Sequence, residues 1–423
     1  MLDIRLIREN TEKVKERLQV RGKGDEASVD LILEVDGKRR EVIAQVEKLK
    51  AERNSISKDI GARKAKGEAA DDLLAGMKEK SDLITELDKQ QTDLDEQQRQ
   101  LLLSVPNLPH AACPIGLDAA ANPVVRTFGE KPTFTFKPVE HVALVEKLGL
   151  VDFAAGTKIS GSGFFVLRQQ GARLERALLN FLLDLHTREH GYTEVSPPFL
   201  VREASMYGTG QLPKFREDMY QLEGEALFLA PTAEVPITNL HREEILNRNQ
   251  LPISYAAYTP CFRREAGSAG RDNRGMIRVH QFDKVELVKI VEPQHSYEQL
   301  ETLRKHAERV LELLGLHYRT IELCTGDMGF GAAKCYDIEV WAPGSDSYLE
   351  VSSCSNFEDF QARRMNLRYK TEEKKNVFCH TLNGSGTALP RLFVALIETG
   401  QQEDGTIQLP PVLHSYFGDS AIR

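Results

Sequence analysis

The sequence predicts an α+β protein in which a mostly antiparallel sheet with flanking helices follows a long helical hairpin. Residues 29–103 are rich in charge and contain neither proline nor an aromatic residue, whereas the chain after Pro106 is richer in Gly, Pro and Phe. Strand-like segments cluster in this later part and glycine loops separate them, which favours an antiparallel sheet over a doubly wound one. We therefore expect an N-terminal domain over residues 1–105 and a second domain over residues 106–423.

The N-terminal domain carries two heptad patterns that predict an antiparallel coiled coil. The hydrophobic positions of the first arm are Val35, Val42, Val46, Leu49, Ile56 and Ile60, and those of the second arm are Leu73, Met77, Ile84, Leu87, Leu94 and Leu101. Residues 61–72 between the arms form a short segment that contains glycine, so the second helix is expected to fold back along the first. Two prolines in residues 104–110 end the hairpin because proline cannot continue a helix.

Charge is distributed unevenly along this hairpin. Residues 37–68 hold ten Lys or Arg and five acids, a net charge of +5, whereas residues 69–103 hold four against nine, a net charge of −5. One interpretation is a solvated coiled coil with ion pairs between its helices. The other is a basic face that follows a phosphate backbone.

Composition limits the class of protein. The chain has 423 residues and a net charge of −8, which disfavours indiscriminate binding to DNA but leaves room for a local basic surface. Its apolar runs fall far short of the ~18 residues that a membrane span needs, and its first ten residues lack the apolar core of a signal peptide. We therefore expect a cytoplasmic protein that does not enter a membrane. Six cysteines without a C-x-x-C pair predict no zinc site.

Residues 261–286 place five arginines and a glycine-rich centre between two predicted strands. The chain has no phosphate-binding loop and no dinucleotide fingerprint, so a bound nucleotide would be held by side chains on the sheet. With period-two alternation, one face of the strand pair carries Cys261, Arg263, Glu265, His280, Phe282, Lys284 and Glu286. Such a face offers an arginine to phosphate, a ring to a base and carboxylates to amines. The alternative is an ordinary charged hairpin, with His280 as a structural residue.

Three further segments add polar groups to the predicted sheet. Alternation in residues 229–237 (LAPTAEVPI) predicts a strand with Thr232 and Glu234 on one face. In residues 348–356 (YLEVSSCSN) it places Glu350 and Ser352 on one face, with Ser353 beside them. Residues 382–398 pass from a Gly/Ser turn into an amphipathic helix whose first turns carry Pro390 and Arg391. Carboxylates on sheet faces are costly unless they bind a metal, a cation or a polar ligand.

With these residues in view, the chain resembles the bacterial-type seryl-tRNA synthetase family of class II aminoacyl-tRNA synthetases over essentially its whole length. Residues 191–201 (GYTEVSPPFLV) are similar to motif 1 of the class, residues 261–286 to motif 2, and residues 384–391 (GSGTALPR) to motif 3. Two departures are Arg264, where the family has a small polar residue, and the slightly altered motif 3. Alternation points Arg264 away from the Arg263 face.

The resemblance implies a class II antiparallel sheet and a serine–tRNA ligase. Such an enzyme activates L-serine with ATP and Mg²⁺ to seryl-adenylate and transfers the seryl group to the 3′ end of serine tRNA, with selenocysteine tRNA as a further candidate substrate. The residues that it implies for ATP are Arg263, Arg264, Glu265, Val279, Phe282, Glu350, Val351, Ser352, Ser353 and Arg391. Among them Arg263, Arg391 and Glu350 would be catalytic, and Glu350 and Ser353 would hold Mg²⁺. The residues implied for serine are Thr232, Ala233, Glu234, Glu286, Asn383 and Ser385.

The resemblance also gives the hairpin a purpose. In the family it reaches the long variable arm of the tRNA, largely in trans within a homodimer whose interface is motif 1. The implied tRNA-contacting residues of this chain are Lys48, Arg53, Lys58, Arg63, Lys64 and Arg271.

Two other functions stay open at this point. One is a class II paralogue that activates another small amino acid or loads a carrier protein, against which the basic hairpin argues. The other is an inactive relative that acts as an RNA-binding or coiled-coil scaffold. That alternative would require the loss of a residue such as Arg263, Glu286, Glu350 or Arg391, and all four are present.

Overall fold

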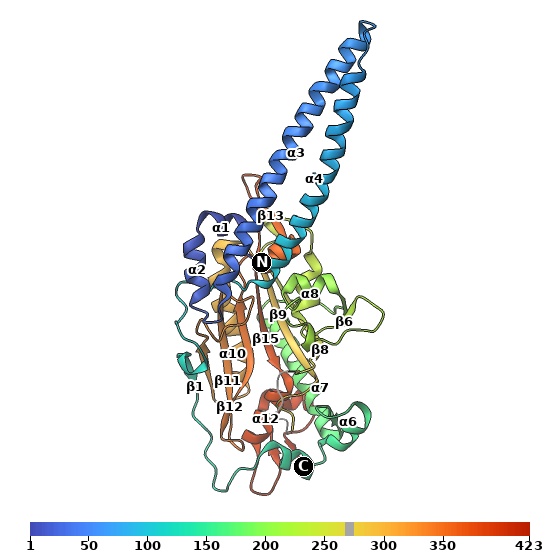
Figure 1. Cartoon of the computed structure of the whole chain (residues 1–423). Coiled ribbons are helices and arrows are strands. Elements are labelled where there is room, and N and C mark those ends of the chain that lie inside the picture. The colour runs from blue at the N-terminus through green and yellow to red at the C-terminus, as the bar shows by residue number, and fades with distance from the viewer. Residues whose placement is uncertain (267–274) are drawn as a thin grey trace. The chain divides into compact units, whose positions relative to one another are not determined.

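The computed structural model describes residues 1–266 and 275–423 and divides into two compact units (Figure 1). The helical unit comprises Met1–Gln19 and Lys23–Pro106, and the sheet unit comprises Val20–Gly22 and Asn107–Arg423. Arg271, one of the residues expected to contact tRNA, lies outside the described residues. No helix in the described chain combines the length and the apolar character of a membrane-spanning segment.

The helical unit is built around the predicted hairpin, whose two long helices run side by side in Figure 1. Its elements are α1 (Ile4–Glu9), α2 (Thr11–Gln19), η1 (Asp25–Ala27), α3 (Ser28–Ala65) and α4 (Asp71–Ser104). The heptad residues that form its core are Val35, Val42, Val46, Leu49, Leu87, Leu94 and Leu101. The fold-back is tighter than expected, because α3 continues through Gly61 and the link occupies only residues 66–70.

Ion pairs cross between α3 and α4 along the hairpin. Lys50 Nζ lies 3.2 Å from Asp88 Oδ1, and Arg63 Nη1 lies 3.0 Å from Asp72 Oδ1. The pairs Arg39–Asp95 and Lys80–Glu52 join the same two helices. The ion-paired coiled coil expected from the charge pattern is therefore present. It leaves exposed lysines on α3, such as Lys48, Lys58 and Lys64.

The sheet unit contains one large sheet in the strand order β1-β10-β11-β12-β15-β9-β8-β4. Its strands are β1 (Val124–Phe128), β4 (Thr193–Glu194), β8 (Ile253–Phe262), β9 (Gln281–Val291), β10 (Tyr318–Glu322), β11 (Lys334–Ala342), β12 (Ser347–Asn356) and β15 (His380–Ala388). Every neighbouring pair is antiparallel except β4 with β8. This confirms the predicted antiparallel α+β architecture.

Helices and small sheets surround this sheet. The helices are α5 (His141–Lys147), α6 (Phe153–Ser160), α7 (Gln169–Asp184), α8 (Glu203–Thr209), α9 (Glu234–Thr238), α10 (Ser296–Leu313), α11 (Phe360–Met365), α12 (Leu389–Gly400) and α13 (His414–Phe417). The small sheets pair β2 (Val151–Asp152) with β3 (Val166–Leu167), β5 (Leu200–Arg202) with β6 (Leu227–Leu229), and β16 (Ile407–Gln408) with β17 (Ala421–Ile422). A further sheet joins β7 (Ile245–Asn247), β13 (Arg368–Lys370) and β14 (Asn376–Phe378).

The main core lies between the large sheet and the amphipathic helices α7, α10 and α12. Their buried residues recur at helical spacing, as in Leu174, Leu178 and Leu182 of α7 or Leu300, Leu303, Ala307 and Leu311 of α10. They pack against strand residues such as Val285 and Leu287 of β9 and Ile338 and Val340 of β11. The core therefore packs against one face of the sheet and supports the polar residues on the opposite face.

The strand predicted over residues 229–237 is wrong. Only Leu227–Leu229 is a strand, and Glu234–Thr238 forms the short helix α9. The hydroxyl of Thr232 accepts a hydrogen bond from the Glu234 N–H at 3.3 Å, and its carbonyl accepts one from the Val235 N–H. A threonine that bonds its own neighbouring backbone in this way favours a helix start over a strand.

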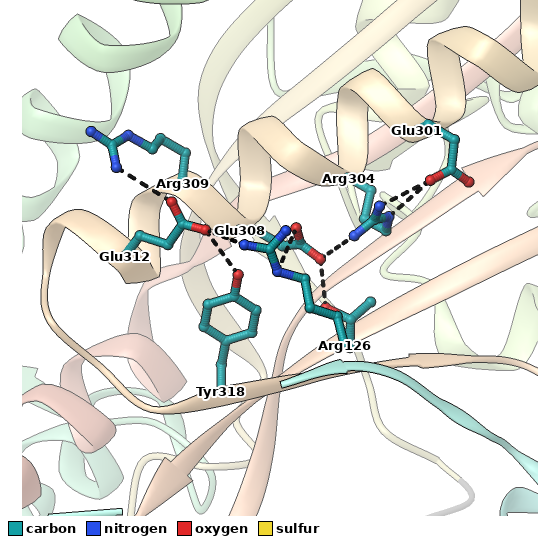
Figure 2. A network of polar contacts seen from close by, with 8 residues as sticks. Arg126, Glu301, Arg304, Glu308, Arg309, Glu312 and Tyr318 are labelled. Carbon is teal, nitrogen blue, oxygen red and sulfur yellow. Dashed lines mark hydrogen bonds and ion pairs between the residues drawn. The ribbon is translucent and has the colours of Figure 1, made fainter. Parts of the chain in front are cut away.

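A network of charged side chains joins α10 to β1 and β10 (Figure 2). The Glu308 side chain is 1% exposed, and it pairs with Arg304 of its own helix and accepts a hydrogen bond from the Thr320 hydroxyl at 2.7 Å. Arg126 of β1 lies 3.6 Å from the other Glu308 oxygen and donates to Glu312 at 2.8 Å. These contacts fasten the edge strand β1 and its neighbour β10 to the helix that packs on the sheet.

Replacing Glu308 with alanine is expected to lower the free energy of unfolding by about 2–3 kcal/mol, because the buried Thr320 hydroxyl loses its acceptor and Arg304 loses one carboxylate partner while keeping Glu301. The control Arg309→Ala removes an exposed partner of Glu312 and should cost less than about 1 kcal/mol. Urea denaturation followed by fluorescence of Trp341, the single tryptophan, measures both. Equal effects of the two substitutions would show that the network does not stabilise the sheet unit.

Candidate functional site

The pairing of β8 with β9 brings the expected site residues together on one surface. Cys261 lies opposite Phe282, and the Arg263 N–H donates to the His280 carbonyl at 2.9 Å just beyond the ladder. Two adjoining cavities of about 660 and 310 Å³ open over this surface. The residues that line both are Arg263, Glu265, Arg278, Lys284, Glu350 and Ser385. We call them the larger and the smaller cavity.

The larger cavity ends in a buried cluster of acids. Glu286 of β9 is fully buried, and its carboxylate lies 2.5 Å from Lys284 Nζ and accepts a hydrogen bond from the Asn383 amide at 3.0 Å. The Thr232 hydroxyl also donates to Glu286, at 3.3 Å, and accepts from Lys284 at 2.9 Å. Ser385 lies opposite Glu286 across β15 and β9. One lysine thus meets a carboxylate that is otherwise surrounded by uncharged donors.

A second carboxylate, Glu234, belongs to the same cluster. The Gln361 amide donates to it at 2.6 Å, and the residue is buried at the start of α9. Burial and the nearby charge of Glu286 raise the pKa of Glu234 to about 7. The carboxyl groups of Glu234 and Glu286 outnumber the single Lys284 ammonium group here. This end of the cavity therefore suits a small cation such as a second ammonium group.

The smaller cavity is bordered by arginines and an aromatic ring. The Arg263 guanidinium lies 5.2 Å from the centre of the Phe282 ring and donates to the Pro231 carbonyl at 3.3 Å. Arg391, at the start of α12, donates to the carbonyls of Glu350 at 2.9 Å and Ile277 at 3.2 Å. Val279, Val351 and Pro390 complete the wall. A cavity that combines the guanidinium groups of Arg263, Arg278 and Arg391 with an aromatic ring suits a polyanion that carries a flat ring.

An irregularity in β12 changes which polar residues face the larger cavity. Ile338 of β11 pairs with Ser352 and Glu339 pairs with Glu350, so the bulge at Val351 reverses the alternation. Glu350 and Ser353 line the cavity, whereas the Ser352 hydroxyl donates to the Ser385 carbonyl at 2.7 Å. The expectation that Glu350 and Ser352 share a face is therefore wrong.

A further carboxylate lies beneath this bulge. Asp337 of β11 pairs with Ser353, and its burial together with the charge of Glu350 raises the pKa of Asp337 well above its usual value. Asp337, Glu350 and Ser353 therefore present oxygen donors, the type that Mg²⁺ prefers. Across residues 1–266 and 275–423, no group of three or more His, Cys, Asp or Glu is arranged to hold a metal ion.

Most of the residues predicted to bind ATP or serine lie in the cavity walls, and three of them do not. Ala233 is buried in an apolar cluster with Ile237, Ala257 and Val288. Arg264 and Ser352 are likewise absent from the described walls of both cavities. Arg263 lines both cavities, which agrees with the expectation that Arg264 points away from the face that carries Arg263. His280 stacks on Phe164 and bonds the Arg263 carbonyl through Nδ1, which is a structural arrangement.

Sequence reasoning gave no site role to several residues that the tertiary structure places here. They are Lys284, Arg278, Asp337, Ser355 and Gln361. Arg278 pairs with Glu265 at 2.5 Å beside the junction of the two cavities. The alternation of β9 had placed Lys284 on the correct face, but no local pattern points to Gln361, which lies 127 positions from its partner Glu234.

Comparisons with known proteins cover both units of the chain. Residues 1–109 match the family described as seryl-tRNA synthetase N-terminal domain, and residues 216–400 match the tRNA synthetase class II core domain (G, H, P, S and T). The chain is 59% identical over 423 residues to a serine–tRNA ligase of Akkermansia muciniphila, covering 100% of this chain and 99% of that protein. The similarity therefore extends over the whole sequence.

Solved structures are similar in fold over the same length. A crystal structure of seryl-tRNA synthetase from Pyrococcus horikoshii complexed with ATP has a TM-score of 0.94 and 40% identity, covering 100% of this chain and 99% of that one. The cytoplasmic serine–tRNA ligase of Naegleria fowleri in complex with AMP has a TM-score of 0.89 and 28% identity, with the same coverage.

The raised pKa of Glu234 predicts a pH-dependent stability. A folded pKa of about 7 lies above the ordinary value of 4.5, so the folded protein loses stability as pH rises between these values. Glu234→Gln cannot ionise, and its free energy of unfolding relative to wild type should increase from pH 5 to pH 8 by on the order of 2 kcal/mol. Urea denaturation at both pH values tests this. The same difference at pH 5 and pH 8 would show that Glu234 ionises normally in the folded protein.

Proposed function

Because the chain belongs to the seryl-tRNA synthetase family, we propose that it is a serine–tRNA ligase that activates L-serine with ATP and transfers the seryl group to serine tRNA. The observation that carries this proposal is the pair of adjoining cavities. One ends in buried carboxylates, the other lies between two arginines, and Arg263 borders both. An amino acid and a nucleotide triphosphate would therefore meet beside Arg263.

Serine would occupy the larger cavity. Its ammonium group would meet Glu286, with Glu234 and Thr232 close by, while Asn383 and Ser385 supply polar groups around its hydroxyl. A site built to hydrogen-bond a hydroxyl can reject an analogue that lacks it by ~10⁴-fold. Threonine keeps the hydroxyl and must be excluded by the width of the cavity.

ATP would occupy the smaller cavity and extend towards the larger one. The Phe282 ring would stack on adenine, Glu265 would accept from its amino group, and Val279 would pack beside it. Arg263 would bind the α-phosphate and Arg391 the γ-phosphate, since guanidinium groups match phosphate oxygens with two parallel hydrogen bonds.

Glu350 and Ser353 would hold Mg²⁺ together with the phosphates, with Asp337 beneath them. The fit is supported by the oxygen-only donor set and by the raised pKa of Asp337, because two carboxylates that repel each other are stabilised by a cation. Mg²⁺ held in part by substrate phosphates supplies positive charge that stabilises the transferring phosphoryl group.

The reaction proceeds in two steps, and neither needs a protein nucleophile. In the first, a carboxylate oxygen of serine attacks the α-phosphorus, the bond to the bridging oxygen breaks, and pyrophosphate leaves. In the second, a terminal ribose hydroxyl of the tRNA attacks the acyl carbon and AMP leaves. Arg263 and Arg391 would stabilise the negative charge that develops on the phosphates, and the two cavities would align the reactants.

We assign the hairpin of α3 and α4 to tRNA binding, in a homodimer joined through residues 191–201. The exposed Lys48, Lys58 and Lys64, with Arg53, support a basic face on α3, whereas Arg63 already pairs with Asp72. Within residues 191–201, the exposed side chains of Phe199 and Leu200 support an interface.

Exchange of pyrophosphate into ATP, screened with serine, threonine, alanine and glycine, tests the proposed function. We expect exchange that depends on serine, followed by charging of serine tRNA. The competing function is a class II paralogue for another small amino acid or for a carrier protein. Exchange with another amino acid and none with serine would favour that paralogue and refute the proposal.

Arg263→Ala and Arg391→Ala are each expected to slow serine-dependent exchange by ~10²-fold or more, because each removes a charge that stabilises the developing anion. Arg309→Ala, on the exposed face of α10, is the matched arginine control and should leave the rate unchanged. Exchange at the wild-type rate in either site variant would show that the residue has been assigned wrongly.

Deleting residues 38–95 should spare adenylate formation and abolish tRNA charging. The ion pair between Arg39 and Asp95 shows that the two helices are adjacent at the cut, so a short glycine linker can rejoin the chain. The intact protein should lose charging activity steeply as salt rises, since phosphate contacts release counterions. Undiminished charging by the deletion variant would contradict a role of the hairpin in tRNA binding.

A further inference from the structure

The short segment Val20–Gly22 belongs to the sheet unit, although the residues on both sides of it belong to the helical unit. Arg21, at its centre, is 2% exposed. Its guanidinium donates to the carbonyls of Asn107 at 2.9 Å and Ala332 at 2.7 Å, and it lies 3.3 Å from each of the carbonyls of Met328 and Gly329. Burying a charge costs free energy unless it is hydrogen-bonded, and these carbonyls supply such bonds.

The carbonyls that Arg21 contacts belong to a wall of the larger cavity. Residues 329–332 (GFGA) line that cavity, as do Glu234 and Glu286 of the acid cluster. Two glycines in four residues leave few side chains to hold this backbone in place. The Phe330 ring packs against Phe215 and Phe360, and hydrogen bonds to the carbonyl groups of the loop hold its backbone further.

Asn107, the first residue of the sheet unit after the hairpin, holds the same loop. Its side-chain amide donates to the carbonyls of Gly331 at 3.0 Å and Phe357 at 2.8 Å, and its N–H donates to the Phe330 carbonyl at 2.9 Å. The Thr325 hydroxyl donates to the Val20 carbonyl at 2.6 Å just before the loop. Both places where the chain enters the sheet unit are thus fastened to this wall.

We propose that Arg21 is a positioning residue for amino acid activation. It holds residues 328–332 at the distance from Glu234 and Glu286 that fits the amino acid, and Asn107 assists it. The inference rests on the proposed function, in which the larger cavity takes serine. Arg21 also links the segment Val20–Gly22 to the site. A displacement of that segment would move the carbonyl groups that Arg21 binds.

The test compares Arg21→Ala and Arg21→Lys with wild type in the full-length protein, by pyrophosphate exchange at varied serine and varied ATP. We expect KM for serine to rise by about tenfold or more in Arg21→Ala, because small misplacements of a binding wall are costly. KM for ATP should change by less than about threefold. Lysine keeps the charge but lacks the planar fork that reaches several carbonyls, so Arg21→Lys should fall in between.

Two further measurements separate positioning from folding. Methylguanidinium added to Arg21→Ala should lower KM for serine, whereas methylammonium should not. Arg17→Ala, four residues earlier on α2, is the matched control and should match wild type. If Arg21→Ala does not fold, Asn107→Ala takes its place in the test. It removes only the amide donors to Gly331 and Phe357, and it should raise KM for serine more than KM for ATP.

Unchanged KM for serine in a folded variant would overturn the proposal. A parallel loss for both substrates with a lower midpoint of urea unfolding would overturn it as well, since it would show a purely structural role. Failure of the proposed function is seen separately, as absence of serine-dependent exchange in the wild-type protein.

Discussion

The antiparallel ladder between β8 and β9 is the constraint on which the site depends. It places Cys261 opposite Phe282 and Ala257 opposite Glu286, so that a ring, a lysine and a buried carboxylate follow one another at two-residue intervals on one surface. The helices α7, α10 and α12 pack against the large sheet and prevent the ladder from shifting. A slip of one residue would turn every one of these side chains into the core.

The charges above the ladder are arranged so that each end of the site is partly neutralised before any substrate arrives. Lys284 pairs with Glu286 at the acid end, and Arg391 lies 3.6 Å from the Glu350 carboxylate at the other end. Glu234 is the second carboxylate at the acid end, and its burial together with the nearby charge of Glu286 raises its pKa. A site organised in this way is suited to an ammonium group and a polyphosphate, because the charges in the protein interior are already partly paired.

Much of the fold could be predicted from local patterns. The heptads of the hairpin correspond to the helices α3 and α4, and the strands predicted in residues 261–286 and 348–356 correspond to β8, β9 and β12. Prediction failed where a local interaction competes with the pattern. Thr232 bonds its own backbone and starts a helix in place of a strand, and the bulge at Val351 exchanges Ser352 for Ser353 in the cavity wall. The link between α3 and α4 is shorter than its composition indicated, because Gly61 is tolerated within a helix.

The sequence by itself determined most of the elements, the family resemblance and the residues such as Arg263, Glu286 and Arg391 to which we assign the chemistry, because periodicity and motif spacing are local properties of the chain. Only the tertiary structure decided how the site is completed. Gln361 reaches Glu234 across 127 positions, and Arg21 reaches the Ala332 carbonyl across 311. Such contacts produce no periodic pattern in the sequence. They depend on how distant segments pack and on which buried polar groups still need a hydrogen bond.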